Sequence, residues 1–276
     1  MITTENVWHF TAFGFLPLPG LLTRDEALSI REELERLGHE RNHVPSDTAT
    51  EAGGIGDVAA IGERVRALLL DERVYDIPAK ILGHDFTYEG SDAQWHVGDT
   101  PWHGGSGVTQ KPLASIKVSF YLDDLDESNG CLRIIPGGHR NLLQWMDARW
   151  IGVPDYLFAV RNRSVQDELP WGISPQEVPH LPLPSRLGDA CVFTEDLPHA
   201  AFGTKGVRRQ LSFAFMANPV AAHQKRWVKY RNAMGRGITA PRAFAESDDP
   251  RLRKMVAPLL ELGLEPSPEV AAPAAP

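Results

Sequence analysis

Two separated segments of this 276-residue chain concentrate the side chains that could bind a metal ion. The first is AQWHVGDTPWHGG at residues 93–105, which carries His96, Asp99 and His103. The second is GDACVFTEDLPH at residues 188–199, and an arginine pair follows it at positions 208 and 209. Imidazole nitrogens bind divalent transition metals, and a guanidinium group binds a carboxylate with two parallel hydrogen bonds. These residue types are therefore suited to binding a metal ion and an anion.

The order of these motifs resembles the phytanoyl-CoA dioxygenase superfamily of Fe(II)/2-oxoglutarate-dependent enzymes. The matching pieces are Trp95-His96, the NGCLRIIPGGH string from Asn129 to His139, the segment from Gly188 to His199, and Arg208-Arg209. Each piece is common alone, but the set is fairly specific and covers roughly residues 10–220. The spacing of the two Trp-His pairs looks most like the ectoine-hydroxylase branch.

The resemblance implies that His96 and His199 bind one non-haem Fe(II) ion. In such enzymes, two imidazoles and one carboxylate hold the iron on one face and leave three positions open. The resemblance implies that 2-oxoglutarate fills two of these positions and that O₂ takes the third. We therefore expect Fe(II), 2-oxoglutarate and O₂ as cofactor and cosubstrates.

An arginine after His199 should neutralise the far carboxylate of 2-oxoglutarate, by the same resemblance. On a strand, Arg208 shares one face with Ser212, whereas Arg209 shares the other face with Leu211 and Phe213. The small polar face suits a cosubstrate pocket, so we favour Arg208 and keep Arg209 as the alternative. Further candidate contacts to the cosubstrate, each with an ordinary structural role as its alternative, are Lys117, Thr194 and Ser212.

The first histidine motif departs from the family pattern at its carboxylate position. Members of the family normally carry Asp or Glu two residues after the first histidine, but this chain has Gly98 there and Asp99 one residue later. On an extended strand, residue 98 shares a face with His96 and residue 99 points the other way. The iron halogenases that resemble this chain have Gly or Ala at this position, and chloride then binds the iron in place of a carboxylate.

Three functions follow from this departure. We favour a halogenase, in which an Fe(IV)-oxo species abstracts hydrogen from an unactivated C–H bond of a small soluble metabolite and the carbon radical takes chlorine. In the second, a bulge brings Asp99 onto the iron and the enzyme is a hydroxylase. The third is a non-catalytic metal-binding β-barrel module. Aerobic turnover with chloride would separate the first two, and an iron–cosubstrate absorption band would exclude the third.

The substrate and the remaining histidines are less defined by the sequence. His103 could line the substrate pocket or brace its loop by a hydrogen bond. A basic stretch, residues 225–231, could be a solvated helix face or could contact an anionic substrate, and a nucleotide is one class of substrate that it would suit.

The elements that must position these residues are mainly strands. A capping box at Thr23 and Glu26 predicts a helix ending at Gly38, and a glycine-rich loop at 53–56 should precede a second amphipathic helix through 58–69. Strands are predicted at 115–122, 131–135, 190–194 and 208–216, and helices at 141–150, 220–233 and 248–261. The Pro-rich stretch 151–187 is long enough to be a lid. We predict a mainly β fold with flanking helices and a double-stranded β-helix (jelly-roll, cupin-like) core in one domain, 1–264, with a disordered tail at 265–276.

Composition restricts the partners. The net charge of −8 and the absence of a long basic block argue against a nucleic-acid polymer as partner. No signal peptide and no apolar run of membrane-spanning length is seen, and the two cysteines cannot form a disulfide framework. We therefore expect a cytoplasmic protein, monomeric or homodimeric, with a small-molecule substrate and no membrane contact.

Overall fold

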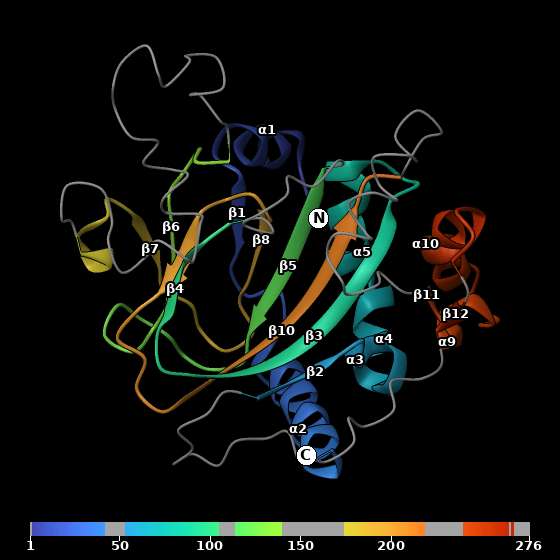
Figure 1. Ribbon diagram of the computed structural model, residues 1–276, viewed down its shortest axis with the longest axis horizontal. Coiled ribbons are helices and arrows are strands. Elements are labelled where there is room, and N and C mark those ends of the chain that lie inside the picture. Colours follow the sequence, from blue (N-terminus) through green and yellow to red (C-terminus); the bar gives the residue numbers. More distant parts are fainter. Residues whose placement is uncertain are drawn as a thin grey trace.

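The computed structural model describes residues 2–41, 53–104, 114–139, 174–218, 240–264 and 266–267. Two antiparallel sheets form its centre (Figure 1). The large sheet has, in spatial order, β1 (Phe15–Leu18), β8 (Ala190–Thr194), β5 (Ser115–Tyr121), β10 (Val207–Met216), β3 (Thr87–Val97) and β2 (Gly53–Gly56). The small sheet has β4 (Thr100–His103), β9 (His199–Ala201), β6 (Leu132–Ile134) and β7 (Leu181–Leu183). This arrangement confirms the predicted jelly-roll core.

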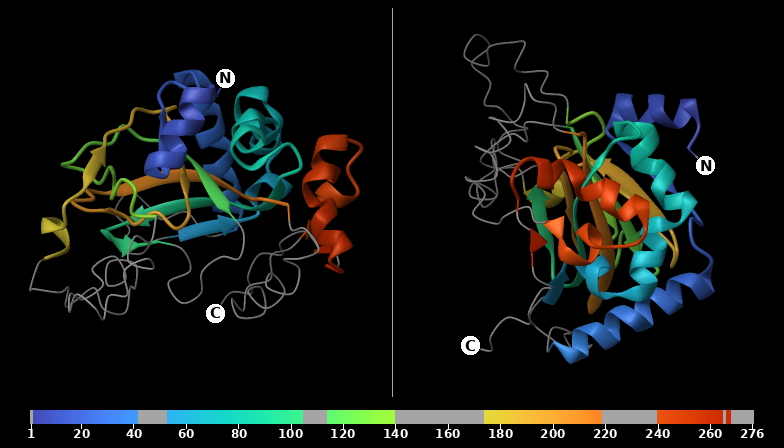
Figure 2. Two further views of the ribbon diagram at one scale, coloured as in Figure 1. Left: turned by 90° about the horizontal axis from the view of Figure 1, so that it is seen from above. Right: turned by 90° about the vertical axis from the view of Figure 1, so that its right-hand side faces the viewer.

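Helices form a layer on one side of the large sheet (Figure 2). They are α1 (Thr4–Phe13), α2 (Arg24–Glu40), α3 (Val58–Ile61), α4 (Glu63–Leu70) and α5 (Glu72–Leu82). Two more, α9 (Arg242–Ala245) and α10 (Pro250–Glu261), lie at the β3 side of the sheet, and α10 contacts β3. Short elements complete the description: a 3₁₀ turn at Pro175–Glu177 and a parallel pair of β11 (Ala240–Pro241) and β12 (Pro266–Ser267). None of the described helices is long and apolar enough to cross a membrane.

The alternation of side chains along each strand of the large sheet builds two separate cores. One face packs against the helices, and its buried members include Val118, Phe120, Val192, Leu211 and Phe213. The opposite face contributes Tyr121, Cys191 and Phe193, which pack with Leu132 and Ile134 of the small sheet. The interior between the two sheets is therefore only partly filled by apolar side chains, which leaves room for a polar site.

The helix layer follows the predicted capping signals, with one interruption. Thr23 and Glu26 form the expected capping box of α2. The second amphipathic helix is not continuous, because it breaks at Gly62 into α3 and α4. Gly62 offers no side-chain cap, and buried Glu33 of α2 accepts hydrogen bonds from the backbone N–H groups of residues 63, 64 and 65 at 2.9–3.1 Å instead.

Two local predictions are wrong. Residues 53–56 were expected to be a loop but form β2, which pairs with β3. The lack of a side chain at Gly54 leaves room for Gln94 of β3, because a Cβ at position 54 would lie 2.6 Å from the side-chain oxygen of Gln94. Pro266 and Ser267 are paired in β12, so the predicted disordered tail does not include them. The predicted helix at 248–261 is confirmed as α10, whereas those at 141–150 and 220–233 and most of the predicted lid lie outside the described residues.

Candidate active site

A cavity of about 590 Å³ lies between the two sheets. Its large-sheet wall comes from the inward face of four neighbouring strands, β8, β5, β10 and β3, and its small-sheet wall comes from β4, β6 and β9. The residues that line it are Asp92, Gln94, His96, Val97, Asp99, Thr100, Pro101, His103, Lys117, Tyr121, Leu132, Phe193, His199, Ala200, Ala201, Arg208 and Gln210. Both sequence segments singled out for their chemistry therefore meet in one place.

His103 and His199 are direct neighbours on the small sheet. They are register partners of β4 and β9, and their ring centroids are 4.0 Å apart. Nδ1 of His103 lies 2.9 Å from the carbonyl oxygen of Pro101, and Nδ1 of His199 lies 2.8 Å from that of Leu197. A carbonyl oxygen only accepts, so both Nδ1 atoms carry the hydrogen, and in the neutral imidazole Nε2 then carries the lone pair that a metal needs.

His96 has a different environment, on the large sheet. Its register partner on β10 is Arg208, and its Nε2 lies 3.1 Å from Oε1 of Gln210. Burial, together with the positive charge of Arg208, lowers the pKa of His96 to about 4. His96 is therefore a neutral imidazole whose Nε2 is already engaged by an amide.

Arg208 is the buried cation of the cavity. Its side chain donates to the carbonyl oxygen of Gly130 at 3.0 Å and to Oγ1 of Thr100 at 2.9 Å, and its Nε has no hydrogen-bond partner among the described residues. Burial lowers the pKa of the guanidinium, and no carboxylate within the described ranges forms an ion pair with it. A buried charge without an opposite charge is costly, so this environment fits an anionic ligand.

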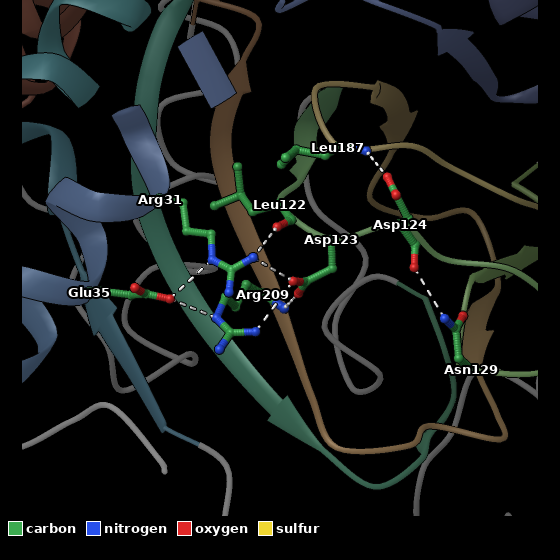
Figure 3. A network of polar contacts seen from close by, with 8 residues as sticks. All are labelled: Arg31, Glu35, Leu122, Asp123, Asp124, Asn129, Leu187 and Arg209. Atoms are coloured by element: carbon green, nitrogen blue, oxygen red, sulfur yellow. Dashed lines mark hydrogen bonds and ion pairs between the residues drawn. The ribbon is translucent and has the colours of Figure 1, made fainter. Parts of the chain in front are cut away.

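Arg209 does not reach the cavity. Its side chain points to the helix side of the sheet, where it joins Glu35, Asp123 and Arg31 in a network of ion pairs (Figure 3). The Arg209 Nε lies 2.9 Å from Glu35, and its own backbone N–H donates to Asp123 at 2.7 Å. Strand alternation separates the two arginines, and the alternative assignment of the cosubstrate site to Arg209 is not compatible with this position.

The other predicted cosubstrate contacts divide in the same way. Lys117 lines the cavity, where its Nζ lies 3.3 Å from Oδ1 of Asp92. Ser212 points inward but is fully buried beneath the cavity wall, with its hydroxyl 3.0 Å from that of Ser119. Thr194 ends β8 and is not among the lining residues.

Gly98 and Asp99 form the turn between β3 and β4. Gly98 has φ of +74°, and apart from its chain neighbours no described atom lies within 4 Å of where a Cβ would stand. Oδ1 of Asp99 accepts from the backbone N–H groups of Gly203 at 2.8 Å and Thr204 at 3.3 Å. In the part of the chain that the structure describes, no three His, Cys, Asp or Glu side chains are grouped closely enough to share a metal ion.

Comparison with known proteins identifies the family. A family model for phytanoyl-CoA dioxygenase (PhyH) matches residues 10–210, well over half of the chain. This chain therefore belongs to the phytanoyl-CoA dioxygenase family. An ectoine dioxygenase from Streptomyces avermitilis is 28% identical over 159 residues, which cover 51% of this chain and 53% of that protein. The chain spans about half the length of the curated relatives it matches.

Solved structures show the same fold. HygX from Streptomyces hygroscopicus, solved with nickel and 2-oxoglutarate bound, matches with a TM-score of 0.58 and 20% identity, covering 78% of this chain and 87% of that one. EctD from S. alaskensis with bound Fe matches with a TM-score of 0.58 and 18% identity, covering 78% of this chain and 77% of that one. The named curated relatives are dioxygenases, so the comparisons support the hydroxylase alternative better than the halogenase that the motif favours.

The sequence also carries a signal for His103. The string Trp-His-x-Gly occurs twice, at residues 95–98 and again at 102–105. The resemblance matches the first copy to the family's metal motif and places the second imidazole at His199, which leaves His103 without a ligand role. Only the register of β4 on β9, which depends on a partner about 100 residues away, distinguishes the two copies.

Proposed function

We propose that this chain is an Fe(II)- and 2-oxoglutarate-dependent enzyme that oxidises a C–H bond of a small molecule. We assign the iron to His103 and His199, in place of the pair His96 and His199 that the sequence favoured. The observation that carries this assignment is the direct pairing of the two rings, each with Nδ1 held by a carbonyl oxygen. Membership of the dioxygenase family supports the reaction class.

The described residues fit both the iron ion and 2-oxoglutarate. Backbone carbonyls that fix the tautomer of a metal-binding histidine are the usual outer partners of such sites. Arg208 supplies the cation that the far carboxylate of 2-oxoglutarate needs, and its buried position strengthens that contact. Iron and 2-oxoglutarate, when bound, supply the O₂-dependent oxidation.

The remaining cavity residues orient the substrate and limit water. Phe193 packs on His199 with ring centroids 4.9 Å apart and covers one side of the histidine pair. Across the cavity, the large sheet presents a polar wall that consists of Asp92, Gln94, His96 and Lys117. These side chains are placed to hold polar groups of a substrate or cosubstrate opposite the histidine pair.

We propose chlorination as the outcome, with chloride as a further ligand of the iron. The family's carboxylate position holds a glycine whichever histidine begins the motif: Gly98 follows His96, and Gly105 follows His103. Gly105 lies outside the described residues, so this step rests on the sequence. The neighbouring carboxylate of Asp99 is occupied by two backbone N–H groups, which argues against its use as the missing ligand.

Hydroxylation is the second candidate, and the relatives favour it. The curated proteins that this chain matches are named ectoine dioxygenases. In this case water or hydroxide would take the position that chloride takes in the first proposal. The substrate stays open in both cases; a nucleotide and a small zwitterion such as ectoine are the two classes to test first.

The experiment is aerobic turnover of the full chain with Fe(II) and 2-oxoglutarate, with and without chloride, against a panel that includes ectoine and nucleotides. Succinate formation reports cosubstrate use, and mass analysis reports the product. A chlorinated product that disappears without chloride supports the first proposal. A hydroxylated product that is insensitive to chloride overturns it in favour of the second. If neither an iron–cosubstrate absorption band nor succinate is detected, the result favours the non-catalytic metal-binding module.

A pair of glycine variants identifies the motif independently. Gly105→Asp should abolish chlorination and could permit hydroxylation, because a carboxylate would then reach the iron beside His103. Gly98→Asp is the matched control and should keep chlorination. Asp suits this position because it tolerates the positive φ of residue 98 better than most residues do. Loss of chlorination in Gly98→Asp with full activity in Gly105→Asp would return the metal site to His96.

A further inference from the structure

Three chain segments are linked to one another next to Arg208. Asp99 of the β3–β4 turn binds the backbone of the β9–β10 turn through Gly203 and Thr204. The loop before β6 meets the same turn, since a Cβ on Gly130 would lie 2.5 Å from Oγ1 of Thr204. Arg133 ties this loop to the β9–β10 turn, because it donates to the carbonyl oxygens of residues 127 and 202. These contacts join the three segments to one another.

The guanidinium of Arg208 is anchored to two of these segments. One terminal nitrogen donates to the carbonyl oxygen of Gly130 at 3.0 Å, and the other donates to Oγ1 of Thr100 at 2.9 Å. Thr100 follows Asp99 directly, so the clamp on Asp99 also fixes the position of the threonine hydroxyl. A planar guanidinium held at both terminal nitrogens has its remaining donors in a fixed direction.

We propose that Thr100 and Asp99 are positioning residues for Arg208: Thr100 orients the guanidinium, and Asp99 holds the turn that carries Thr100. This inference rests on the proposed function, in which Arg208 binds the far carboxylate of 2-oxoglutarate. It assigns Asp99 to the support of the β3–β4 turn, whereas the hydroxylase alternative placed it on the iron. In the positioning role Oδ1 is occupied by the two backbone N–H groups, so only Oδ2 would be left for a metal.

Four variants test the proposal by direct binding of 2-oxoglutarate and, separately, of Mn(II), each measured by calorimetry on the full chain. Thr100→Val removes the hydroxyl while keeping the shape, and Thr100→Ser restores it. Asp99→Ala removes the clamp, whereas Asp99→Asn keeps an oxygen that can accept from Gly203. Asp124→Ala is the matched control: its carboxylate also accepts from a loop N–H, that of Leu187 at 2.7 Å (Figure 3), but Asp124 does not line the cavity.

We expect about a 10-fold or greater loss of 2-oxoglutarate affinity in Thr100→Val, because a hydrogen bond to a charged group is lost, and recovery in Thr100→Ser. Asp99→Ala should lose a similar factor, while Asp99→Asn and Asp124→Ala stay within about threefold of the wild type. Mn(II) affinity should be unchanged in all of them. Wild-type 2-oxoglutarate affinity in Thr100→Val or Asp99→Ala overturns the inference, and so does a loss of Mn(II) affinity in both Asp99 variants. Failure of the wild type itself to bind 2-oxoglutarate would instead overturn the proposed function.

Discussion

Replacement of one histidine distinguishes the two candidate metal sites. His103→Ala removes one of the two imidazoles assigned to the iron, whereas His96→Gln changes a side chain of the opposite wall that is already bonded to Gln210. Loss of an outer partner of a metal ligand costs about 10–100-fold in affinity. Loss of a ligand itself should therefore cost at least about 100-fold, which is about 2.8 kcal/mol.

The assay is titration of the metal-free full chain with Mn(II) or Co(II), with the absorption of Co(II) as a report on imidazole ligation. His103→Ala should bind at least 100-fold more weakly, and added imidazole should restore part of the affinity, because the ring can enter the cavity through the space that the substitution leaves. His96→Gln should stay within about threefold of the wild type. The reasoning is refuted by the opposite pattern, in which His96→Gln loses the metal and His103→Ala keeps it.

Three further predictions concern stability and reactivity. Glu33→Ala should lower the free energy of unfolding in urea by about 3 kcal/mol, because it leaves three backbone N–H groups at the start of α4 without their charged acceptor. Glu33→Gln should lower it by about 1–2 kcal/mol, and a loss below about 0.5 kcal/mol in Glu33→Ala would contradict this reasoning. The pKa of His96 falls from 6.5 to about 4 on folding, so the unfolded chain binds the proton first as the pH drops, and the metal-free protein should lose up to about 3 kcal/mol of stability between pH 6.5 and 4. His96→Gln should lack that part of the pH dependence, and parallel curves for the two proteins would count against it. Burial raises the pKa of Cys191 to about 12 and also raises that of Cys131, so neither thiol should react with a thiol reagent at pH 8 until urea unfolds the chain; rapid labelling of the folded protein would show that this core opens.

The fold was predictable from the sequence where local patterns were strong. Alternation in SIKVSFYL and the capping box at Thr23 each describe one element through near neighbours, and both were confirmed. β2 was missed because its residues are mostly glycine, which carries no hydrophobic period; it becomes a strand only because β3 offers a partner edge. The break at Gly62 was missed because its cap comes from Glu33, about 30 residues away.

For the candidate site, the residue types were evident in the sequence and their grouping was not. Two histidine motifs, an arginine pair and a glycine in the carboxylate position indicated the family and its chemistry without any coordinates, since those side chains have few other reasons to occur in that order. Tertiary structure decided which histidine stands beside His199, because cross-strand register is set by contacts between distant segments. It also decided that Arg208 faces the cavity while Arg209 belongs to the network with Glu35. Neighbouring residues of a strand point to opposite faces, and the packing of the helices decides which face lies away from the cavity. The chain thus carries its chemistry in its composition and spacing, and the packing of the two sheets selects the side chains that meet.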